Sequence, residues 1–248
     1  MSDDDYATYV SVTERKAKAK KLISILKKKD KNISPVIINS RIKIAHSFWG
    51  QAWCKNIESY RDLDYRLEQG RSYVRSGAVV DLRISEKQVR SQVIGSELYK
   101  VKIDFNSFPK ESWNSFTKKC TSVTDSIVDL LSGKIPDVVS KLITDESIGL
   151  FPNPNEIKFD CNCLDYADVC KHIAATLYGI GVHFDKDPNL FFILRGVDPS
   201  DLIKKSREEL TQGTKDTISN ETMEDLFNIE IGTSTNNFTP EKSVLRLS

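Results

Sequence analysis

Residues 73–105 read YVRSGAVVDLRISEKQVRSQVIGSELYKVKIDF, and this segment carries the clearest β-strand pattern of the chain. Apolar and polar side chains alternate along three arms, which cover 73–85, 88–96 and 98–105. Alternation with a period of two is typical of β-strands that bury one face. The connections at 85–87 and 95–97 are short, as they are in hairpins. We therefore expect an antiparallel meander of three or more strands.

The apolar side chains of the meander share one face of the predicted sheet. They are Val80, Leu82 and Ile84 on the first arm, Val89 and Val93 on the second, and Tyr99, Val101, Ile103 and Phe105 on the third. The basic side chains lie mainly elsewhere, and they are Arg75, Arg83, Arg90, Lys100 and Lys102. We expect the apolar face to be buried and the basic residues to stay at the surface.

Helical periodicity precedes the meander. Residues 12–29 place Ala19, Leu22, Ile23 and Leu26 at helical spacing among many lysines, and Ser34-Pro35 disfavours any continuation of this helix. Residues 48–68 place Trp53, Ile57, Tyr60 and Leu67 at the same spacing, and Gln69-Gly70 interrupts the pattern. These segments predict two helices, of which the first is basic and amphipathic.

Helices also follow the meander. After Phe108-Pro109 the pattern predicts a helical insertion, with one helix opened by Trp113 and Phe116, a second at 122–133 and a third at 135–143. Further on, KHIAATLYGIGVHF at 171–184 predicts a helix closed by Gly179 or Gly181. Helices through 191–194 and from Pro199 follow. The fold class is therefore α+β, an antiparallel β-meander flanked by helices.

These patterns divide the chain into four parts. We predict a basic N-terminal helix at 1–35, an α+β body with the meander and the helical insertion at 36–148, a cysteine-rich segment with its following helices at 149–210, and a loosely ordered polar tail at 211–248.

The composition is that of a soluble globular protein, with 39% hydrophobic and 29% charged residues. No stretch is apolar enough for a membrane helix, and the N-terminal sequence MSDDDYATYV lacks a secretory signal. We therefore expect a cytoplasmic protein with no membrane partner. Neither a glycine-rich phosphate loop nor a Gly-x-Ser-x-Gly motif occurs, which excludes most enzyme classes, and no small-molecule substrate is predicted.

Three of the five cysteines gather with one histidine in a short segment. The pattern is Cys161-x-Cys163, six further residues, and then Cys170-x-His172. Zn²⁺ prefers four soft or borderline ligands in a tetrahedron, and Cys3His is one of its standard closed sets. The pattern predicts one structural zinc ion held by these four side chains, whereas the other two cysteines pack as small hydrophobes.

The spacing of the cluster also predicts its local geometry. Cys-x-Cys at the end of a strand can direct both sulfurs at one ion. Residues two apart do not share a face in the middle of a helix, so Cys170 and His172 suit the first turn of the following helix. Three thiolates around Zn²⁺ leave one negative charge, which Lys171 is placed to offset, and Asp165 is placed to orient a ligand. An exposed lysine and a turn-forming aspartate are the alternatives for these two residues.

Cys-x-Cys, a short gap and Cys-Lys-His followed by Ile-Ala-Ala together resemble the SWIM zinc finger. The resemblance extends over residues 12–205 through the blocks ERKAKAKKL, SPVII, FWGQAWCKNIE, RLEQGRSYVRSGAVVDLRI, VIGSELYKVKI, LFP and FFILRG. Where the family often has Cys-x-Cys-Pro-Asp-Trp, this chain has Leu164, Asp165 and Tyr166. The ligands are retained, so the departure concerns local packing and not the metal.

Basic residues outside the cluster predict contact with nucleic acid, because arginine and lysine bind phosphate. The candidates are Lys20, Lys27, Lys28, Arg66, Arg71, Arg75, Arg83 and Arg90. The alternative for the lysine-rich helix is a plain solvated face, and the formal net charge of the chain is only +1.

Two functions follow from these patterns. The resemblance implies that the chain binds DNA or proteins, and that it is similar to prokaryotic SWIM proteins that accompany Swi/Snf-type helicases. A DNA-binding module acting with such a helicase is the first hypothesis, and a protein adaptor without nucleic-acid affinity is the second. An enzyme ranks below both, because zinc with four protein ligands has no open position for water or substrate.

Overall fold

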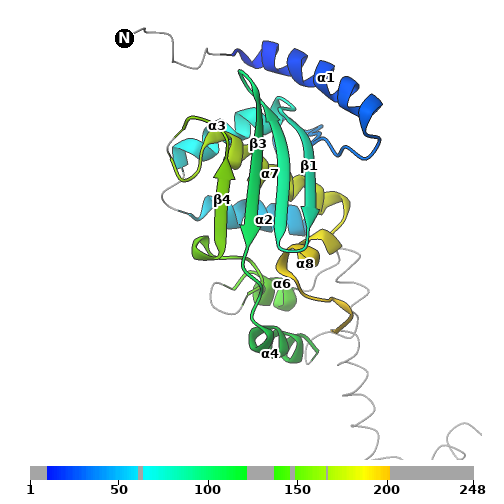
Figure 1. Cartoon of the computed structure of the whole chain (residues 1–248). Coiled ribbons are helices and arrows are strands. Elements are labelled where there is room, and N and C mark those ends of the chain that lie inside the picture. Colours follow the sequence, from blue (N-terminus) through cyan, green and yellow to red (C-terminus); the bar gives the residue numbers. More distant parts are fainter. Residues whose placement is uncertain (1–9, 61–63, 122–136, 146–148, 166, 202–248) are drawn as a thin grey trace, which may run out of the picture. The chain divides into compact units, whose positions relative to one another are not determined.

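The alternating stretch forms the antiparallel meander that its pattern predicts. Strands β1 (Val79–Ser85), β2 (Gln88–Ile94) and β3 (Leu98–Phe105) follow one another through short turns. A fourth strand, β4 (Ile157–Cys161), lies beside β3, and the order in the sheet is β1-β2-β3-β4, as Figure 1 shows. With the helices around it, this sheet confirms the α+β class.

The computed structural model describes residues 10–60, 64–121, 137–145, 149–165 and 167–201. The chain divides into two units, Met1–Lys205 and Ser206–Ser248, and the described residues all belong to the first. The predicted helix at 122–133, most of the helix predicted from Pro199 and the predicted tail at 211–248 lie outside the described residues. The four-part division of the chain remains a prediction.

The register of the sheet sorts its side chains onto two faces. Leu82 lies opposite Ser91, Ser91 opposite Val101, and Val101 opposite Cys161. This row belongs to the face that packs against the helices, and the apolar residues predicted for that face are all buried or half-buried. The opposite face is polar and reaches solvent.

Helix α7 (Lys171–Lys186) lies against the apolar face of the sheet, and every side chain from His172 to Phe184 is buried. The sheet covers one side of α7, while helices α2 and α3 cover the other (Figure 1). Trp53 of α2 donates its Nε1–H to the carbonyl oxygen of Leu177 at 2.7 Å. Burial on all sides matches the almost uniformly apolar sequence of this helix.

The prediction of one helix over residues 48–68 is wrong, because the segment forms two helices, α2 (Phe48–Glu58) and α3 (Asp64–Arg75). Helix α2 ends where the chain turns inward at Tyr60. The Tyr60 hydroxyl donates to the carbonyl oxygen of Pro152 at 2.7 Å, and its side chain is buried. The Ser59 hydroxyl also donates to the Asn56 carbonyl at 2.6 Å, so a local contact and a distant one both hold the chain where the helix ends.

The prediction of an interruption at Gln69-Gly70 is also wrong, because α3 continues through both residues. A Cβ atom on Gly70 would lie 2.5 Å from the Cβ of Ala174 and 2.7 Å from its backbone carbon. Both distances are shorter than atoms tolerate, so the missing side chain lets α3 approach α7 closely. Gly70 is a packing residue and not a helix breaker.

The same reason corrects the predicted end of the helix at Gly179 or Gly181, since α7 continues through both residues. A Cβ atom on Gly181 would lie 3.1 Å from the carbonyl oxygen of Gly50 in α2. A Cβ atom on Gly179 would lie 2.8 Å from the Leu82 side chain of β1. The two glycines let α7 approach α2 on one side and the sheet on the other.

Helix α1 (Val12–Lys29) is the predicted basic helix, and it packs against β1 and β2. An arginine of α1 also packs against the C-terminal end of α3. Arg15 is only 5% exposed, and its guanidinium donates to Ser76 Oγ at 3.0 Å and to Ser72 Oγ at 3.3 Å. The same group lies 3.8 Å above the centre of the Tyr73 ring. Arg15 therefore anchors α1.

Residues 34–36 cover the outer edge of β1. The Val36 N–H donates to the carbonyl of Val79 at 3.0 Å, and the Leu82 N–H donates to the carbonyl of Ser34 at 2.9 Å. A covered edge does not pair with other chains.

The remaining elements are α4 (Lys110–Thr121), α6 (Asp137–Ile143), the 3-10 helix η2 (Pro154–Glu156) and α8 (Asn189–Arg195). The three helices among them confirm predicted ones.

No helix in the described part of the chain is both long and apolar enough to span a bilayer.

Gly70→Ala should lower the free energy of unfolding by about 2 kcal/mol, because the added methyl group collides with the backbone of α7. The higher helix propensity of alanine offsets part of this loss, by about 1 kcal/mol. Denaturant unfolding measures the difference. Glu68→Ala, at an exposed position of the same helix, serves as the control and should change stability by about 0.5 kcal/mol or less. Equal stability of G70A and wild type would contradict the close contact of α3 with α7.

Candidate metal centre

The four predicted ligands come from two elements that meet at one end of the sheet. Strand β4 ends at Cys161, and Cys163 follows in the next turn. Cys170 is the N-cap of α7, with extended backbone angles of φ −83° and ψ 169°, and His172 lies in the first helical turn. Because only one of these last two residues is helical, their side chains converge although they are two positions apart. This is the geometry that the spacing predicts.

The ligand atoms of the four side chains all lie within 4.8 Å of one another. His172 Nδ1 is 3.9 Å from Cys161 Sγ and 3.8 Å from Cys170 Sγ. In a tetrahedral zinc site, the usual bond lengths separate sulfur from nitrogen by about 3.6 Å. The cluster therefore has the size and the donor set to hold a metal ion, and Nδ1 is the ring nitrogen that faces it.

Two tyrosines hold the His172 ring in place. The Tyr99 ring stacks on it with the ring centroids 3.9 Å apart and the planes at 20°, while Tyr73 meets it edge-on with centroids 5.5 Å apart. His172 Nε2 is buried and has no hydrogen-bond partner among the described residues. Metal-bound histidines usually donate their second N–H to an oxygen. Here ring stacking orients the imidazole instead.

The three thiols influence one another's protonation. The hydrogen bond that Cys161 donates to Cys170 lowers the pKa of Cys170 to about 3 and raises the pKa of Cys161. Burial raises the pKa of Cys163. The N-cap position of Cys170 also favours a thiolate. Cys170 is therefore the first sulfur to lose its proton, and a metal ion must displace protons from the other two.

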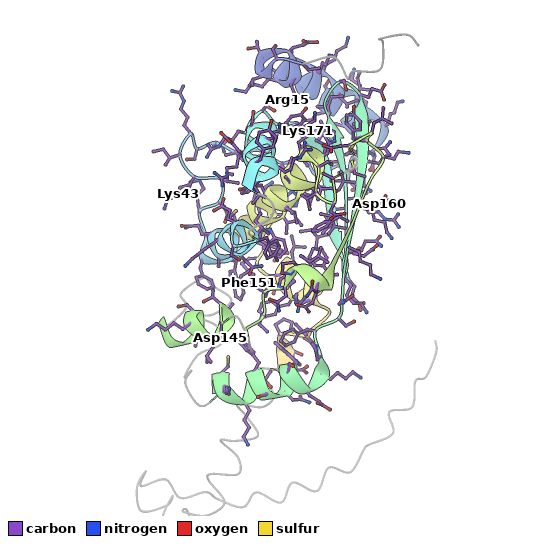
Figure 2. The ribbon with its side chains drawn as sticks, turned by 90° about the vertical axis from the view of Figure 1, so that its left-hand side faces the viewer. Arg15, Lys43, Asp145, Phe151, Asp160 and Lys171 are labelled. Carbon is purple, nitrogen blue, oxygen red and sulfur yellow. The ribbon has the colours of Figure 1, made fainter. Side chains whose placement is uncertain are left out.

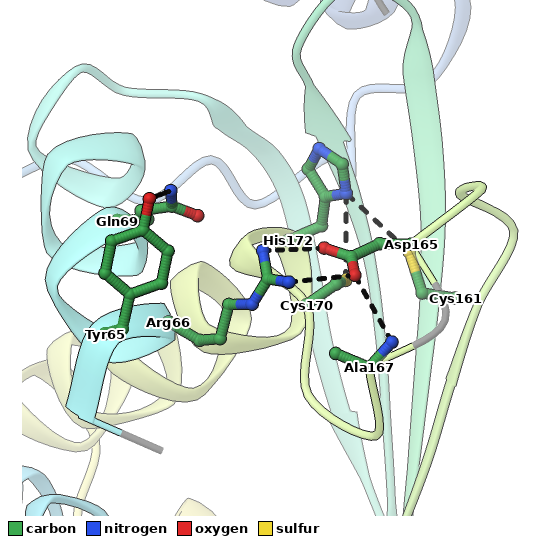
Figure 3. A network of polar contacts seen from close by, with 8 residues as sticks. All are labelled: Tyr65, Arg66, Gln69, Cys161, Asp165, Ala167, Cys170 and His172. Carbon is green, nitrogen blue, oxygen red and sulfur yellow. Dashed lines mark hydrogen bonds and ion pairs between the residues drawn. The ribbon is translucent and has the colours of Figure 1, made fainter. Parts of the chain in front are cut away.

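Asp165 holds the loop between the ligands, as Figure 3 shows. Its Oδ1 accepts the backbone N–H of Ala167 at 3.2 Å. The Arg66 guanidinium of α3 contacts both carboxylate oxygens, at 2.9 and 3.1 Å. A bidentate pair of this kind is among the stronger polar contacts in proteins. The sequence pattern assigns Arg66 to nucleic acid, but in the structure this side chain ties the ligand loop to α3.

Lys171 is half-buried, and its Nζ lies 5.8 Å from the centre of the Tyr73 ring. Arg15 lies over the same ring, which in turn touches His172. Two cations therefore lie against the ring that contacts His172. The sequence pattern does not predict that Tyr73 contacts His172 or that Arg15 packs on the Tyr73 ring. One signal for it exists, because Arg15 lies four residues before Ala19, on the buried stripe of its helix.

The other basic residues predicted on α3 are engaged with the protein itself. Arg71 binds the Glu58 carboxylate at 3.2 Å and the Tyr178 hydroxyl at 2.6 Å. Arg75 donates to the backbone carbonyls of residues 41 and 42 at 2.6 and 2.8 Å. Their charge remains, but two nitrogens of each guanidinium group already bind oxygen atoms of the protein.

The remaining predicted basic residues lie on the polar face of the sheet and on α1. Arg83 binds the carboxylates of Asp30 and Asp81, and Arg90 donates to the Gln88 side chain at 2.6 Å. The predicted lysines of α1 are exposed, and they are Lys20, Lys27 and Lys28. The structure thus distributes the predicted basic residues over three places and does not gather them in one.

The fold and the cluster define an α+β protein with a Cys3His group that can hold a metal ion. The chain is similar to "Uncharacterized protein Rv2102" of Mycobacterium tuberculosis (strain ATCC 25618 / H37Rv), with 33% identity over 168 residues. The aligned region covers 66% of this chain and 60% of that relative, so the chain spans less than two thirds of the relative's length. No family model matches the chain. No solved structure matches it either.

Arg66→Ala should weaken the affinity for Zn²⁺ by about tenfold, because the ligand loop loses its tie to α3. Competition against a chromophoric chelator measures this affinity. Arg71→Ala is the matched control, since it removes an arginine from the same helix without touching the ligand loop, and it should leave zinc affinity unchanged. If both variants bind zinc as the wild type does, Arg66 has no role at the metal centre.

Proposed function

We propose that this protein is a non-enzymatic, zinc-stabilised module that binds nucleic acid, DNA in the first place, through the polar face of its sheet. One observation carries the proposal. Arg83 of β1 lies opposite Arg90 of β2, and Arg90 lies opposite Lys102 of β3. Like charges directly opposed on neighbouring strands destabilise a sheet. A bound chain of phosphates would remove that repulsion.

A groove of about 520 Å³ runs over this row. Lys100 lines it together with the three residues of the row, and Lys158 of β4 is exposed on the same face. Neither Arg90 nor Lys100 forms an ion pair with an acidic residue in the described part of the chain. Their charges are therefore available to a ligand, and the open groove admits one.

Two acidic residues of this face hold basic side chains in position, and a third, Asp160, lies opposite Lys102 and lines the same groove. Asp81 is buried, and its carboxylate accepts the Arg83 Nε–H at 2.9 Å and the Ser34 N–H at 2.8 Å. Asp104 binds Lys102 at 2.6 Å, and this hydrogen bond lowers the pKa of the Asp104 carboxyl. Such pairs fix the geometry of the row while contributing little stability at the surface.

Among the described residues, the polar face carries charged and amide side chains and no aromatic ring. Proteins that read unpaired bases stack them on exposed aromatic rings. A face without them is suited to phosphates, which carry no sequence information. We therefore expect binding that depends on charge and salt, and that differs little between sequences.

The C-terminal end of α1 adjoins the row. Asp30 follows the helix directly and binds Arg83, and Lys27 and Lys28 lie in the last helical turn. These two lysines extend the basic surface beyond the sheet. Lys20 lies two turns earlier on the exposed side of the helix and is a weaker candidate for contact.

The metal supports this function from inside the protein. Four protein ligands complete a tetrahedral zinc site, so no position is left for water or substrate, and the ion would serve structure and not catalysis. It would fix the end of β4 to the start of α7. The resemblance to SWIM proteins supports both the DNA-binding function and a Swi/Snf-type helicase as the partner.

Metal analysis of the purified chain should find one Zn²⁺ per molecule, and Cys161→Ser should abolish most of that content. Chelation should lower amide protection across residues 159–182, because β4 and α7 lose their common ligand set. Hydrogen exchange reports this change. The variant Cys54→Ser changes a cysteine outside the cluster and should keep the wild-type zinc content. Wild-type zinc content in C161S would exclude the proposed site.

The double variant Arg90→Ala, Lys102→Ala should weaken binding to a short DNA duplex, with the largest loss at low salt. Its slope of log affinity against log salt should be smaller by about 1.8, because two phosphate contacts are removed. Fluorescence anisotropy between about 50 and 200 mM salt measures both quantities.

Lys55→Ala is the control for this experiment, because it removes an exposed charge from α2, which lies behind α7 as seen from the polar face (Figure 1). This variant should bind DNA as the wild type does. The proposal fails if wild-type binding does not weaken with salt, or if the double variant and the control bind equally.

A further inference from the structure

A second groove, of about 300 Å³, is formed by residues 42–45, α2 and α3. It lies among the helices that cover the apolar face of the sheet. Figure 2 shows Lys43 of this groove and Asp160 of the polar face on opposite sides of the molecule. The proposed binding of nucleic acid makes no use of this groove.

The loop that forms one wall of the groove is held at both ends. Arg75 of α3 donates from both terminal nitrogens to the carbonyls of Arg41 and Ile42, at 2.6 and 2.8 Å. Asp185 of α7 accepts the backbone N–H of His46 at 2.6 Å. The Ile42 side chain is 85% exposed between these anchor points. Its apolar surface is therefore held toward solvent by a fixed backbone, ready for a partner.

One part of the groove lining is apolar and chemically inert. Ile44, Ala45 and Cys54 line it together with Ile42. Burial raises the pKa of the Cys54 thiol to about 12, so the sulfur stays protonated and neutral. A neutral thiol is neither a nucleophile nor a metal ligand. The groove thus suits an apolar side chain and offers no catalytic group.

The rim of the groove is basic. It carries Lys43, Lys55, Arg71 and Arg75, with Glu58 as the acidic residue among its lining. The two arginines already bind protein oxygens. Lys43 and Lys55 are exposed and pair with no acidic residue in the described ranges. The groove therefore combines a positive field with two available ammonium groups.

We infer that this groove docks an acidic peptide segment of a partner protein, one that combines Asp or Glu with a bulky apolar side chain. The carboxylates would meet Lys43 and Lys55, while the apolar side chain would cover Ile42 and fill the groove. Nucleic acid fits less well. Its backbone has no apolar group to cover Ile42, and the arginine forks that bind phosphate best are occupied.

The test is a selection from a random peptide library displayed on phage, with the zinc-loaded full-length chain as the target. The selected peptides should be enriched in Asp and Glu together with Leu, Ile or Phe. Synthetic copies carrying a fluorophore are then titrated with the wild type and the variants, and anisotropy measures their affinity.

Ile42→Ser should lower the affinity for the selected peptides by about tenfold. The double variant Lys43→Glu, Lys55→Glu should lower it by at least as much. All three positions are exposed, so each variant should melt at the wild-type temperature. The sheet-face variant Arg90→Ala, Lys102→Ala should bind these peptides as the wild type does. If the protein does not bind DNA, the test of peptide binding at the groove is still valid.

Three outcomes would overturn the inference. One is a selection that enriches no acidic and apolar peptides. Another is peptide affinity that survives both groove variants. The last is a loss of DNA affinity, and not of peptide affinity, in the lysine variant, which would assign the groove to nucleic acid.

Discussion

Helix α7 is buried along nearly its whole length, and the rest of the structure is arranged around this constraint. A helix without a solvent face needs a packed partner on every side. The sheet supplies one side, and α2 and α3 supply the other. Packing of this density leaves no room for an extra methyl group where elements cross. Glycines therefore occupy the closest approaches, at Gly70, Gly179 and Gly181.

Specific polar groups fix both ends of this buried helix. At its start, Cys170 and His172 face Cys161 at the end of β4, so a bound metal would join the helix to the sheet. At its end, the Asp185 carboxylate binds the backbone just before α2. The metal cluster is tied outward as well, through Asp165 to α3. Metal binding, sheet and helices therefore form one connected structure.

Two surfaces on opposite sides of this core differ in chemistry. The polar sheet face combines opposed basic residues with acidic groups that pair with two of them. The groove beside residues 42–45 combines a small apolar part with a basic rim. A net charge of +1 conceals both, because it says nothing of where the charges lie. On the sheet face, Asp81 and Asp104 pair with basic residues, while Arg90 and Lys100 form no ion pair among the described residues. The two proposed binding surfaces therefore do not overlap.

The amino-acid pattern alone predicts the strands of the meander and the four side chains that can hold a metal ion. Both are local: alternation and turn length decide the strands, and donors of the right type in one short segment decide the site. Three features are visible only in the folded chain: β4 pairs with β3, Gly70 packs inside a helix, and Arg66 holds Asp165. Each of these depends on a contact between residues far apart in the chain, and such a contact leaves no period or motif in the sequence around either partner.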